Sequence, residues 1–211
     1  MENVERLLAR NLMEIEAVLL RPSKPFQWAS GWFSPIYCDN RRLLSYPEIR
    51  SQVVSWMAEK VESLYPEAEL IAGVATGAIA LGVLVADKLS KPFIYVRPKP
   101  KDHGTGSQIE GILHKGDKVV IIEDLISTGM SSLAAARALK EAGAEVLGMT
   151  AIFTYGFEKA VKSFAEAGIK LDTLSNYESL ISVAKEIGYI KENEYKILQD
   201  WRLAPDLWNK K

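Results

Sequence analysis

The stretch 118–132 constrains the fold of this chain more than any other. Residues 119–122 are Val-Val-Ile-Ile, a run of apolar β-branched side chains that predicts a strand buried on both faces. Glu123 and Asp124 follow this strand directly, and a helix is expected to begin at about Ser132. Such βα units are typical of an α/β fold with a parallel sheet, in which ligands bind beyond the carboxyl ends of the strands.

The turn 127–131 between that strand and that helix suits a phosphate group. Its sequence is Ser-Thr-Gly-Met-Ser, and the helix behind it offers unpaired N–H groups and the positive end of its dipole. Glu123 and Asp124 would repel an anion, so the vicinal hydroxyl groups of a ribose or a magnesium ion suit them better. The pattern predicts a sugar-phosphate site, because a turn that only caps a helix needs no acidic pair before it.

This stretch resembles the signature with which type I phosphoribosyltransferases bind 5-phosphoribosyl 1-diphosphate (PRPP). The shared features are an apolar strand, an acidic pair and a Thr/Ser-Gly-x-Ser/Thr loop. The resemblance implies that the acidic pair holds the ribose hydroxyl groups, that the loop holds the 5′-phosphate, and that Asp124 is catalytic. The PRPP-binding residues implied here are Glu123, Asp124, Leu125, Ile126, Ser127, Thr128, Gly129, Met130 and Ser131.

A second stretch that carries chemistry is 97–106, with the sequence Arg-Pro-Lys-Pro-Lys-Asp-His-Gly-Thr-Gly. It has no apolar periodicity, so we expect a loop rather than a helix or strand. Its cations suit a diphosphate, and its glycines suit a flexible catalytic loop that closes as a lid. Taken alone, the stretch fits an ordinary solvated run of charges equally well.

The loop extends the resemblance to the orotate phosphoribosyltransferase family, whose Arg-x-x-x-Lys-x-His-Gly-x-Gly pattern it matches. Residues 30–41, Ser-Gly-Trp-Phe-Ser-Pro-Ile-Tyr-Cys-Asp-Asn-Arg, and the Ile-Glu-Gly at 109–111 are similar to the same family. The resemblance implies that Arg97, Lys101 and His103 bind the diphosphate, with Lys101 also catalytic because it stabilises charge during transfer. It further implies a homodimer in which this loop acts across the subunit interface.

Two more assignments come from the resemblance. Thr76 and Gly77 lie in a small-residue turn that corresponds to a loop whose backbone amides bind pyrophosphate. A tight βα turn packed closely against its neighbours would need small residues too, and this alternative stays open. Ser127 corresponds to a residue that contacts orotate.

This chain also departs from some members of the family. They carry a lysine where this chain has Ala29, and an arginine in the segment that corresponds to 155–159, which here is Tyr-Gly-Phe-Glu-Lys. Pro98 replaces a second cation after Arg97. The sequence therefore does not identify the side chains that recognise the orotate carboxylate.

The implied function is that of an enzyme, a pentosyltransferase of pyrimidine biosynthesis. It would move the phosphoribosyl group from PRPP to orotate and give orotidine 5′-monophosphate and pyrophosphate. Mg²⁺ would act as cofactor through PRPP and water, with no direct protein ligand. Two alternatives remain: a transferase for a purine base or uracil, and a non-catalytic PRPP-sensing regulator. The regulator should carry an added basic or helix-turn-helix segment, and the formal net charge of −1 does not suggest one.

The length of 211 residues fits one domain over 1–211, with a small N-terminal hood over about 1–45 and a PRPP-binding core over about 46–211. No apolar run approaches the roughly 20 residues of a membrane span, and the acidic start is unlike a signal peptide. The single cysteine, Cys38, excludes an intramolecular disulfide and is expected to be buried rather than nucleophilic. We expect a cytoplasmic protein without membrane or nucleic-acid partners.

The order of the elements predicts an α/β fold with a mostly parallel central sheet flanked by helices, and the family resemblance implies that this fold is type I phosphoribosyltransferase-like. Aromatic side chains crowd the segment before the sheet, where core packing is favoured over a roof for a planar base. These aromatic residues are Phe26, Trp28, Trp32, Phe33 and Tyr37. Helices are expected over 2–20, 47–64, 79–89, 132–142, 158–167 and 175–201, strands over 70–75, 93–96, 118–124, 146–154 and 171–174, and short strands and turns over 26–39.

Overall fold

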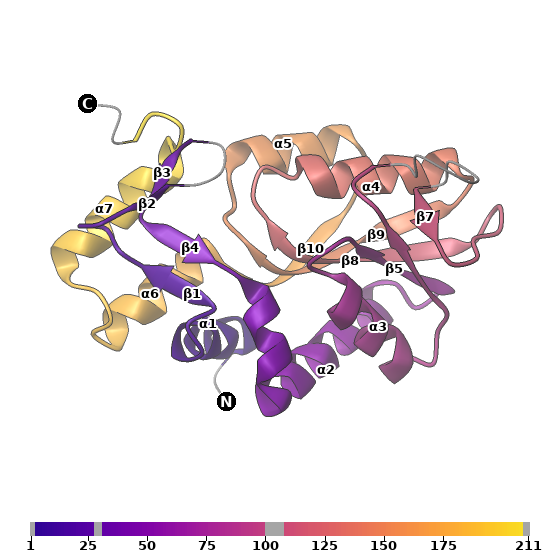
Figure 1. Ribbon diagram of the computed structural model, residues 1–211, viewed down its shortest axis with the longest axis horizontal. Helices are drawn as coiled ribbons and strands as arrows, with labels where there is room; N and C mark the ends of the chain where they lie inside the picture. Colours follow the sequence, from indigo (N-terminus) through magenta and orange to yellow (C-terminus); the bar gives the residue numbers. More distant parts are fainter. Residues whose placement is uncertain (1–2, 28–30, 100–107, 209–211) are drawn as a thin grey trace.

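A sheet of six strands forms the centre of the molecule in a computed structural model, which describes residues 3–27, 31–99 and 108–208 (Figure 1). The strand order is β10-β9-β8-β5-β6-β7, and every neighbouring pair is parallel except β6 and β7. The mostly parallel α/β fold expected from the sequence is confirmed. The strands are β5 (Leu70–Val74), β6 (Phe93–Val96), β7 (Ile109–Glu110), β8 (Lys118–Ile126), β9 (Glu145–Thr154) and β10 (Leu171–Asn176).

Helices cover both faces of this sheet, which explains the unbroken apolar run of β8. Val120 and Ile122 pack into the core beneath α2 (Pro47–Leu64) and α3 (Ile79–Lys88). Val119 and Ile121 point the other way, into the core beneath α4 (Met130–Glu141) and α5 (Glu158–Glu166). Figure 1 shows α4 and α5 above the sheet and α2 and α3 below it. All four side chains are fully buried, as a strand with two covered faces requires.

The direction of the chain through the sheet reverses between β5 and β8. From β5 the chain moves outward to β6 through α3, whereas from β8 it moves the opposite way to β9 and β10 through α4 and α5. A reversal of this kind opens a crevice beyond the carboxyl ends of the two central strands, because the helices that follow them lie on opposite faces. The fold alone therefore places a ligand site at the ends of β5 and β8.

The N-terminal and C-terminal parts of the chain lie together on one side of the sheet (Figure 1). The N-terminal part comprises α1 (Val4–Glu14), β1 (Val18–Leu20), β2 (Phe26–Gln27), β3 (Phe33–Ser34) and β4 (Ile36–Cys38), and the C-terminal part α6 (Tyr177–Glu186) and α7 (Glu192–Leu203). Trp201 of α7 is fully buried and its indole N–H donates to the carbonyl of Phe33 at 3.3 Å. The rings of Tyr155, Phe157 and Tyr177 surround it. The last helix thus fixes the position of the N-terminal strands.

Two expected helices have the wrong bounds. The helix expected over 2–20 ends at Glu14, because Glu16 adopts a φ of 55° and 18–20 pair with β4 as a strand. The helix expected over 175–201 is divided into α6 and α7 at Gly188, which has a φ of 73°. The sequence did not indicate the short strand β7 or the 3₁₀ helix η1 (Asn40–Ser45). In short segments such as 18–20, the spacing of apolar residues does not distinguish a helix from a strand.

The aromatic residues before the sheet also differ from expectation. The side chains of Phe33 and Tyr37 are 39% and 41% exposed, so they do not pack in the core. Phe26 contacts Tyr37 with 5.6 Å between ring centroids. Trp28 lies outside the described residues. Within the described part of the chain, no helix is long and apolar enough to cross a membrane.

Thr150 of β9 offers a test of how this core is packed. Its side chain is fully buried, and its hydroxyl oxygen has no hydrogen-bond partner among the described residues. Valine has the same shape without the hydroxyl, so Thr150→Val should raise the free energy of unfolding by about 1 kcal/mol. Thr154 is the matched control, because its hydroxyl donates to the carbonyl of Ile126 at 3.4 Å and accepts from the N–H of Gly156 at 3.0 Å.

Urea unfolding followed by circular dichroism measures both variants. Thr154→Val should lose stability by about 1 kcal/mol, the opposite sign to Thr150→Val. A loss of stability in both variants would show that the Thr150 hydroxyl has a partner in solution.

Candidate active site

A cavity of about 330 Å³ lies where β5 and β8 end, at the reversal in the sheet. It brings together three segments that are far apart in the sequence, and we call it the acidic cavity. Its lining residues are Cys38, Asp39, Arg41, Val74, Ala75, Thr76, Gly77, Glu123, Asp124, Leu125 and Ser131. The predicted site residues of the 73–79 turn and of the acidic pair therefore meet in one place.

In the turn after β5, the backbone of Gly77 packs directly against the carboxylate of Asp124. A Cβ atom added to Gly77 would lie 2.1 Å from Oδ2 of Asp124, and the next two nearest atoms also belong to that carboxylate. Only glycine fits while the carboxylate keeps this position. The peptide bond between Ala75 and Thr76 is cis. The structure thus places Thr76 and Gly77 beside Asp124, whereas donation of their amides to pyrophosphate stays a prediction.

Glu123 is turned into the protein rather than into open solvent. It is 4% exposed, its Oε2 accepts from the hydroxyl of Ser132 at 2.7 Å, and its Oε1 accepts from the N–H of Asp124 at 3.0 Å. Burial raises the pKa of Glu123 well above its usual value, and the neighbouring charge of Asp124 raises this pKa further. Glu123 therefore ties the end of β8 to the first turn of α4, and its contact with a ribose stays a prediction.

The raised pKa of Glu123 has a consequence for stability. The folded protein binds this proton more tightly than the unfolded chain, so the free energy of unfolding should fall as the pH rises from the usual glutamate pKa toward the folded value. One such group gives a slope of at most about 1.4 kcal/mol per pH unit. Glu123→Gln removes the titrating group. The free energy of unfolding of this variant, relative to that of the wild type, should therefore rise with pH.

Unfolding in urea at several pH values between about 5 and 8 measures this difference. Glu62→Gln, which changes an exposed carboxylate of α2, is the control and should follow the wild type at every pH. A constant difference between Glu123→Gln and the wild type would contradict the assignment of the raised pKa.

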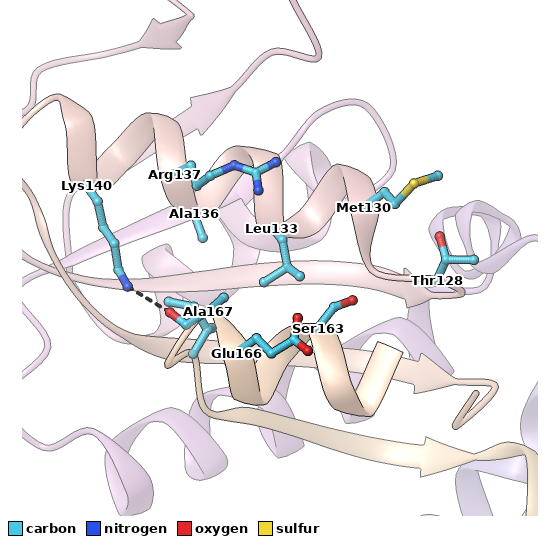
Figure 2. A pocket seen from close by; sticks show the side chains of 10 residues that line it. Thr128, Met130, Leu133, Ala136, Arg137, Lys140, Ser163, Glu166 and Ala167 are labelled. Carbon is cyan, nitrogen blue, oxygen red and sulfur yellow. Dashed lines mark hydrogen bonds between the residues drawn. The ribbon is translucent and has the colours of Figure 1, made fainter. Parts of the chain in front are cut away.

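The side chains of the turn 127–131 diverge. Ser131 lines the acidic cavity, whereas Thr128 and Met130 line a separate cavity of about 570 Å³ between α4 and α5 (Figure 2). Gly129 precedes α4 with a φ of 79°, a conformation that favours glycine, and a Cβ there would lie 2.8 Å from the ring of Phe164. The turn can thus present Ser131 and the N–H groups of the helix start to a phosphate.

The remaining residues of this stretch are placed as follows. Leu125 lines the acidic cavity, and Ser127 is half-buried at the end of β8. Ile126 is fully buried in the core beneath α4 and α5, so a contact with PRPP would have to come from its backbone. Their roles in binding PRPP and orotate stay predictions.

The α4–α5 cavity shown in Figure 2 has a different character. Arg137, Lys140 and Glu166 project from the two helices toward it, and the ammonium group of Lys140 donates to the carbonyl of Ala167 at 3.3 Å. Its lining includes neither of the two carboxylates that the sequence singled out.

The stretch 97–106, which we call the basic loop, lies in the chain between the antiparallel strands β6 and β7. The N–H of Arg97 donates to the carbonyl of Gln108 at 2.8 Å, and the Gln108 side chain donates back to the carbonyl of Arg97 at 2.7 Å. The Arg97 guanidinium lies 3.7 Å from the carboxylate of Glu110 and is not part of the described lining of the acidic cavity. Lys101 and His103 lie outside the described residues. The structure thus does not bring Arg97 together with the acidic pair of the same chain.

Sequence reasoning missed the contribution of the segment after β4. Asp39 holds Arg41 through two hydrogen bonds, from Nε at 2.6 Å and from Nη2 at 2.9 Å. The side chain of Asn40, which is 1% exposed, donates to the carbonyl of Asp124 at 2.6 Å. The half-buried Cys38 has a raised pKa, chiefly because of burial and then because of Asp124 and Asp39, which keeps it a thiol. The signal was present in the sequence as a polar Asp-Asn-Arg run directly after a strand.

The chain is similar to known proteins over nearly its whole length. Residues 39–183 match the family model described as the phosphoribosyl transferase domain. A protein of Cytophaga hutchinsonii named orotate phosphoribosyltransferase is 52% identical over 208 residues, which cover 99% of this chain and 100% of that protein. A protein of the same name from Lactococcus lactis subsp. cremoris is 52% identical over 206 residues, which cover 98% of this chain and 99% of the relative.

Solved structures agree with these relatives. The crystal structure of orotate phosphoribosyltransferase from Aeropyrum pernix superposes with a TM-score of 0.75 at 32% identity, and covers 87% of this chain and 99% of that one. The acidic cavity, its PRPP-type turn and the similarity over nearly the whole length lead to the same conclusion. The chain belongs to the phosphoribosyl transferase family and, within it, to the orotate phosphoribosyltransferases.

Proposed function

We propose that this chain transfers the phosphoribosyl group from PRPP to orotate, in the acidic cavity, and so forms orotidine 5′-monophosphate and pyrophosphate in pyrimidine biosynthesis. The observation that carries the proposal is that Asp124 lies against Gly77 and shares one cavity with Ser131, at the reversal of the sheet. A ribose hydroxyl group at Asp124 would leave the 5′-phosphate near the start of α4 and the diphosphate near the turn after β5. The three parts of PRPP thus have three neighbouring subsites.

The chemistry is displacement at the anomeric carbon of the ribose. Its transition state develops positive charge on the sugar, as glycoside transfer does, and Asp124 would lie beside that charge. A nitrogen of the base attacks, so no protein nucleophile is needed, and the raised pKa of Cys38 fits this view. The protein would orient the two reactants and neutralise the charge that grows on the departing diphosphate. Asp124 and Lys101 are the residues to which we assign catalytic roles.

Magnesium fits this site as an ion held largely by the substrate. Among residues 3–27, 31–99 and 108–208, no three histidine, cysteine or carboxylate side chains come together as a metal site. Asp124 and Asp39 line the cavity and could hold the waters of a magnesium ion whose direct ligands are PRPP oxygens. When bound, the ion would offset negative charge on the diphosphate.

The basic loop would supply the remaining positive charge from a second subunit. Arg97, Lys101 and His103 would bind the diphosphate. Lys101 would also stabilise the negative charge that grows on this leaving group. The ion pair of Arg97 with Glu110, away from the acidic cavity of its own chain, supports an action across a homodimer interface. Closure of the loop would exclude water, which otherwise hydrolyses PRPP.

Subunit exchange tests the shared site. Lys101→Ala and Asp124→Asn homodimers should each have little activity, but a mixture of the two should regain up to about a quarter of the wild-type activity, because a heterodimer has one site with both residues intact. The measurement is turnover before and after exchange, with two affinity tags to verify the heterodimer. No recovery in verified heterodimers would contradict a site shared between subunits.

A panel of bases tests the substrate. Orotate, uracil, adenine and hypoxanthine are each incubated with the wild type, PRPP and Mg²⁺, and the nucleotide products are identified by mass. We expect a product with orotate alone. A product with another base instead of orotate would keep the PRPP site and overturn the choice of base. PRPP binding without any product would identify the non-catalytic regulator, and retention on heparin at low salt would support nucleic-acid binding.

The same proposal includes the arrangement and location of the protein. It keeps one domain with an N-terminal hood over about 1–45 and a PRPP-binding core over about 46–211, and the hydrogen bond from Trp201 of α7 to Phe33 supports the joining of the two parts. A cytoplasmic location is consistent with the single cysteine of the sequence.

A further inference from the structure

We propose that Arg41 binds the diphosphate of PRPP from the side of the N-terminal strands, and that Asp39 positions it. This inference rests on the proposed function, because it assigns a new residue to the same site. It does not follow from the PRPP motif or from the basic loop, since Arg41 lies in neither.

The lining of the acidic cavity carries more negative than positive side chains. Asp39 and Asp124 both line it, and Arg41 is the one cationic side chain in its described lining. PRPP carries a phosphate and a diphosphate, so it would enter a cavity whose walls supply mainly carboxylates. A guanidinium group matches phosphate oxygens in charge and in the geometry of its N–H groups. Arg41 is therefore the described residue of this chain best suited to attract the anion.

Asp39 holds the guanidinium group of Arg41 in a defined orientation. Asp39 accepts hydrogen bonds from Nε and Nη2 of Arg41, which orients the guanidinium. It also accepts from the backbone N–H of Arg41 at 3.2 Å and so caps η1. The hydrogen bond from Arg41 lowers the pKa of Asp39 and keeps it ionised, which preserves the pair. The Nη1 group has no partner among the described residues, and the side chain of Arg41 is 59% exposed. Donors thus remain for a ligand.

A hydrogen bond ties the segment that carries Arg41 to Asp124, the residue assigned to the ribose. Asn40, between Asp39 and Arg41, is buried and donates to the carbonyl of Asp124. This hydrogen bond attaches the segment to the end of β8, across 84 positions of sequence. The diphosphate is bound to the ribose carbon next to the hydroxyl groups that Asp124 would hold. A guanidinium anchored beside Asp124, in the same cavity as the turn after β5, is therefore placed for the diphosphate.

The test measures binding of magnesium pyrophosphate by titration calorimetry, and separate KM values for PRPP and orotate. Arg41→Ala should weaken pyrophosphate binding and raise the KM for PRPP about tenfold to a hundredfold, with a much smaller change in the KM for orotate. Arg41→Lys should recover part of the affinity because it keeps the charge. Asp39→Asn should lower pyrophosphate affinity by a smaller factor, since the guanidinium stays but loses its orientation.

Arg42 provides the matched control. It neighbours Arg41, but its guanidinium donates to the carbonyl of Ile15 at 3.0 Å and to Glu16 at 3.2 Å, away from the cavity. Arg42→Ala should therefore bind pyrophosphate as the wild type does. Unchanged pyrophosphate binding in Arg41→Ala would overturn the inference, and so would a loss confined to orotate, which would reassign Arg41 to the base. Wild-type protein that binds no pyrophosphate and turns over no orotate would instead overturn the proposed function itself.

Discussion

Gly77→Ala is expected to remove most of the transferase activity and to leave the fold nearly as stable as the wild type. The added Cβ would lie 2.1, 2.5 and 2.8 Å from the three nearest atoms, and all three belong to the carboxylate of Asp124. Gly77 does not adopt a left-handed backbone conformation, so alanine is compatible with the backbone itself. The collision can be relieved by rotation of one side chain, and that side chain is the one assigned to the ribose.

The expected loss in kcat/KM is about a hundredfold, the usual effect of moving a reacting group by about 1 Å. Steady-state kinetics measures kcat/KM, and thermal unfolding of the same preparations measures the stability of the fold. A double-mutant cycle with Asp124→Asn is the control, because Gly77→Ala should cost little more once the carboxylate is gone. Wild-type activity in Gly77→Ala would show that Asp124 can leave its position without consequence, and that its assigned role is wrong.

Lys101→Ala is expected to lower kcat about a hundredfold to a thousandfold without a change in the free energy of unfolding. The acidic cavity has one cation in its described lining, so the charge that grows on the diphosphate depends on cations brought by the basic loop. Removal of one group that stabilises developing charge commonly has an effect of this size. The prediction is carried by the sequence of the loop and by the family resemblance.

Lys99→Ala is the matched control, because it removes the same charge from an exposed position two residues away. Turnover should fall much less in Lys99→Ala than in Lys101→Ala, although both change the net charge equally. Single-turnover kinetics separates the chemical step from product release in both variants. Equal losses in the two variants would indicate that the loop acts only through its total charge.

The sequence predicted those parts of the fold that rest on local patterns. The bounds of α2 and β6 were predicted to the residue, because a proline at the first helical position and a short aromatic and β-branched run define them locally. The acidic pair was found because its position after a doubly buried strand is itself a local pattern. The end of α1 was missed, since 18–20 become a strand only by pairing with β4.

The site could be predicted only in part for a related reason. Asp39 and Arg41 join the acidic cavity because Asn40 bonds to the carbonyl of Asp124, and no spacing in the sequence reveals that contact. The burial of Glu123 against Ser132 was equally hidden, although both residues had been noticed. Packing between distant segments decides these features. The motif locates the site, and the three-dimensional contacts decide which of its carboxylates faces the ligand.

The most direct test of the account is the near-ultraviolet absorbance of orotate in the presence of the wild-type protein, PRPP and Mg²⁺. The account predicts a loss of absorbance that requires all three additions and that is reversed when excess pyrophosphate is added after the reaction. Loss of absorbance without PRPP, or none with all three present, would contradict the assignment of the acidic cavity as the site of phosphoribosyl transfer to orotate.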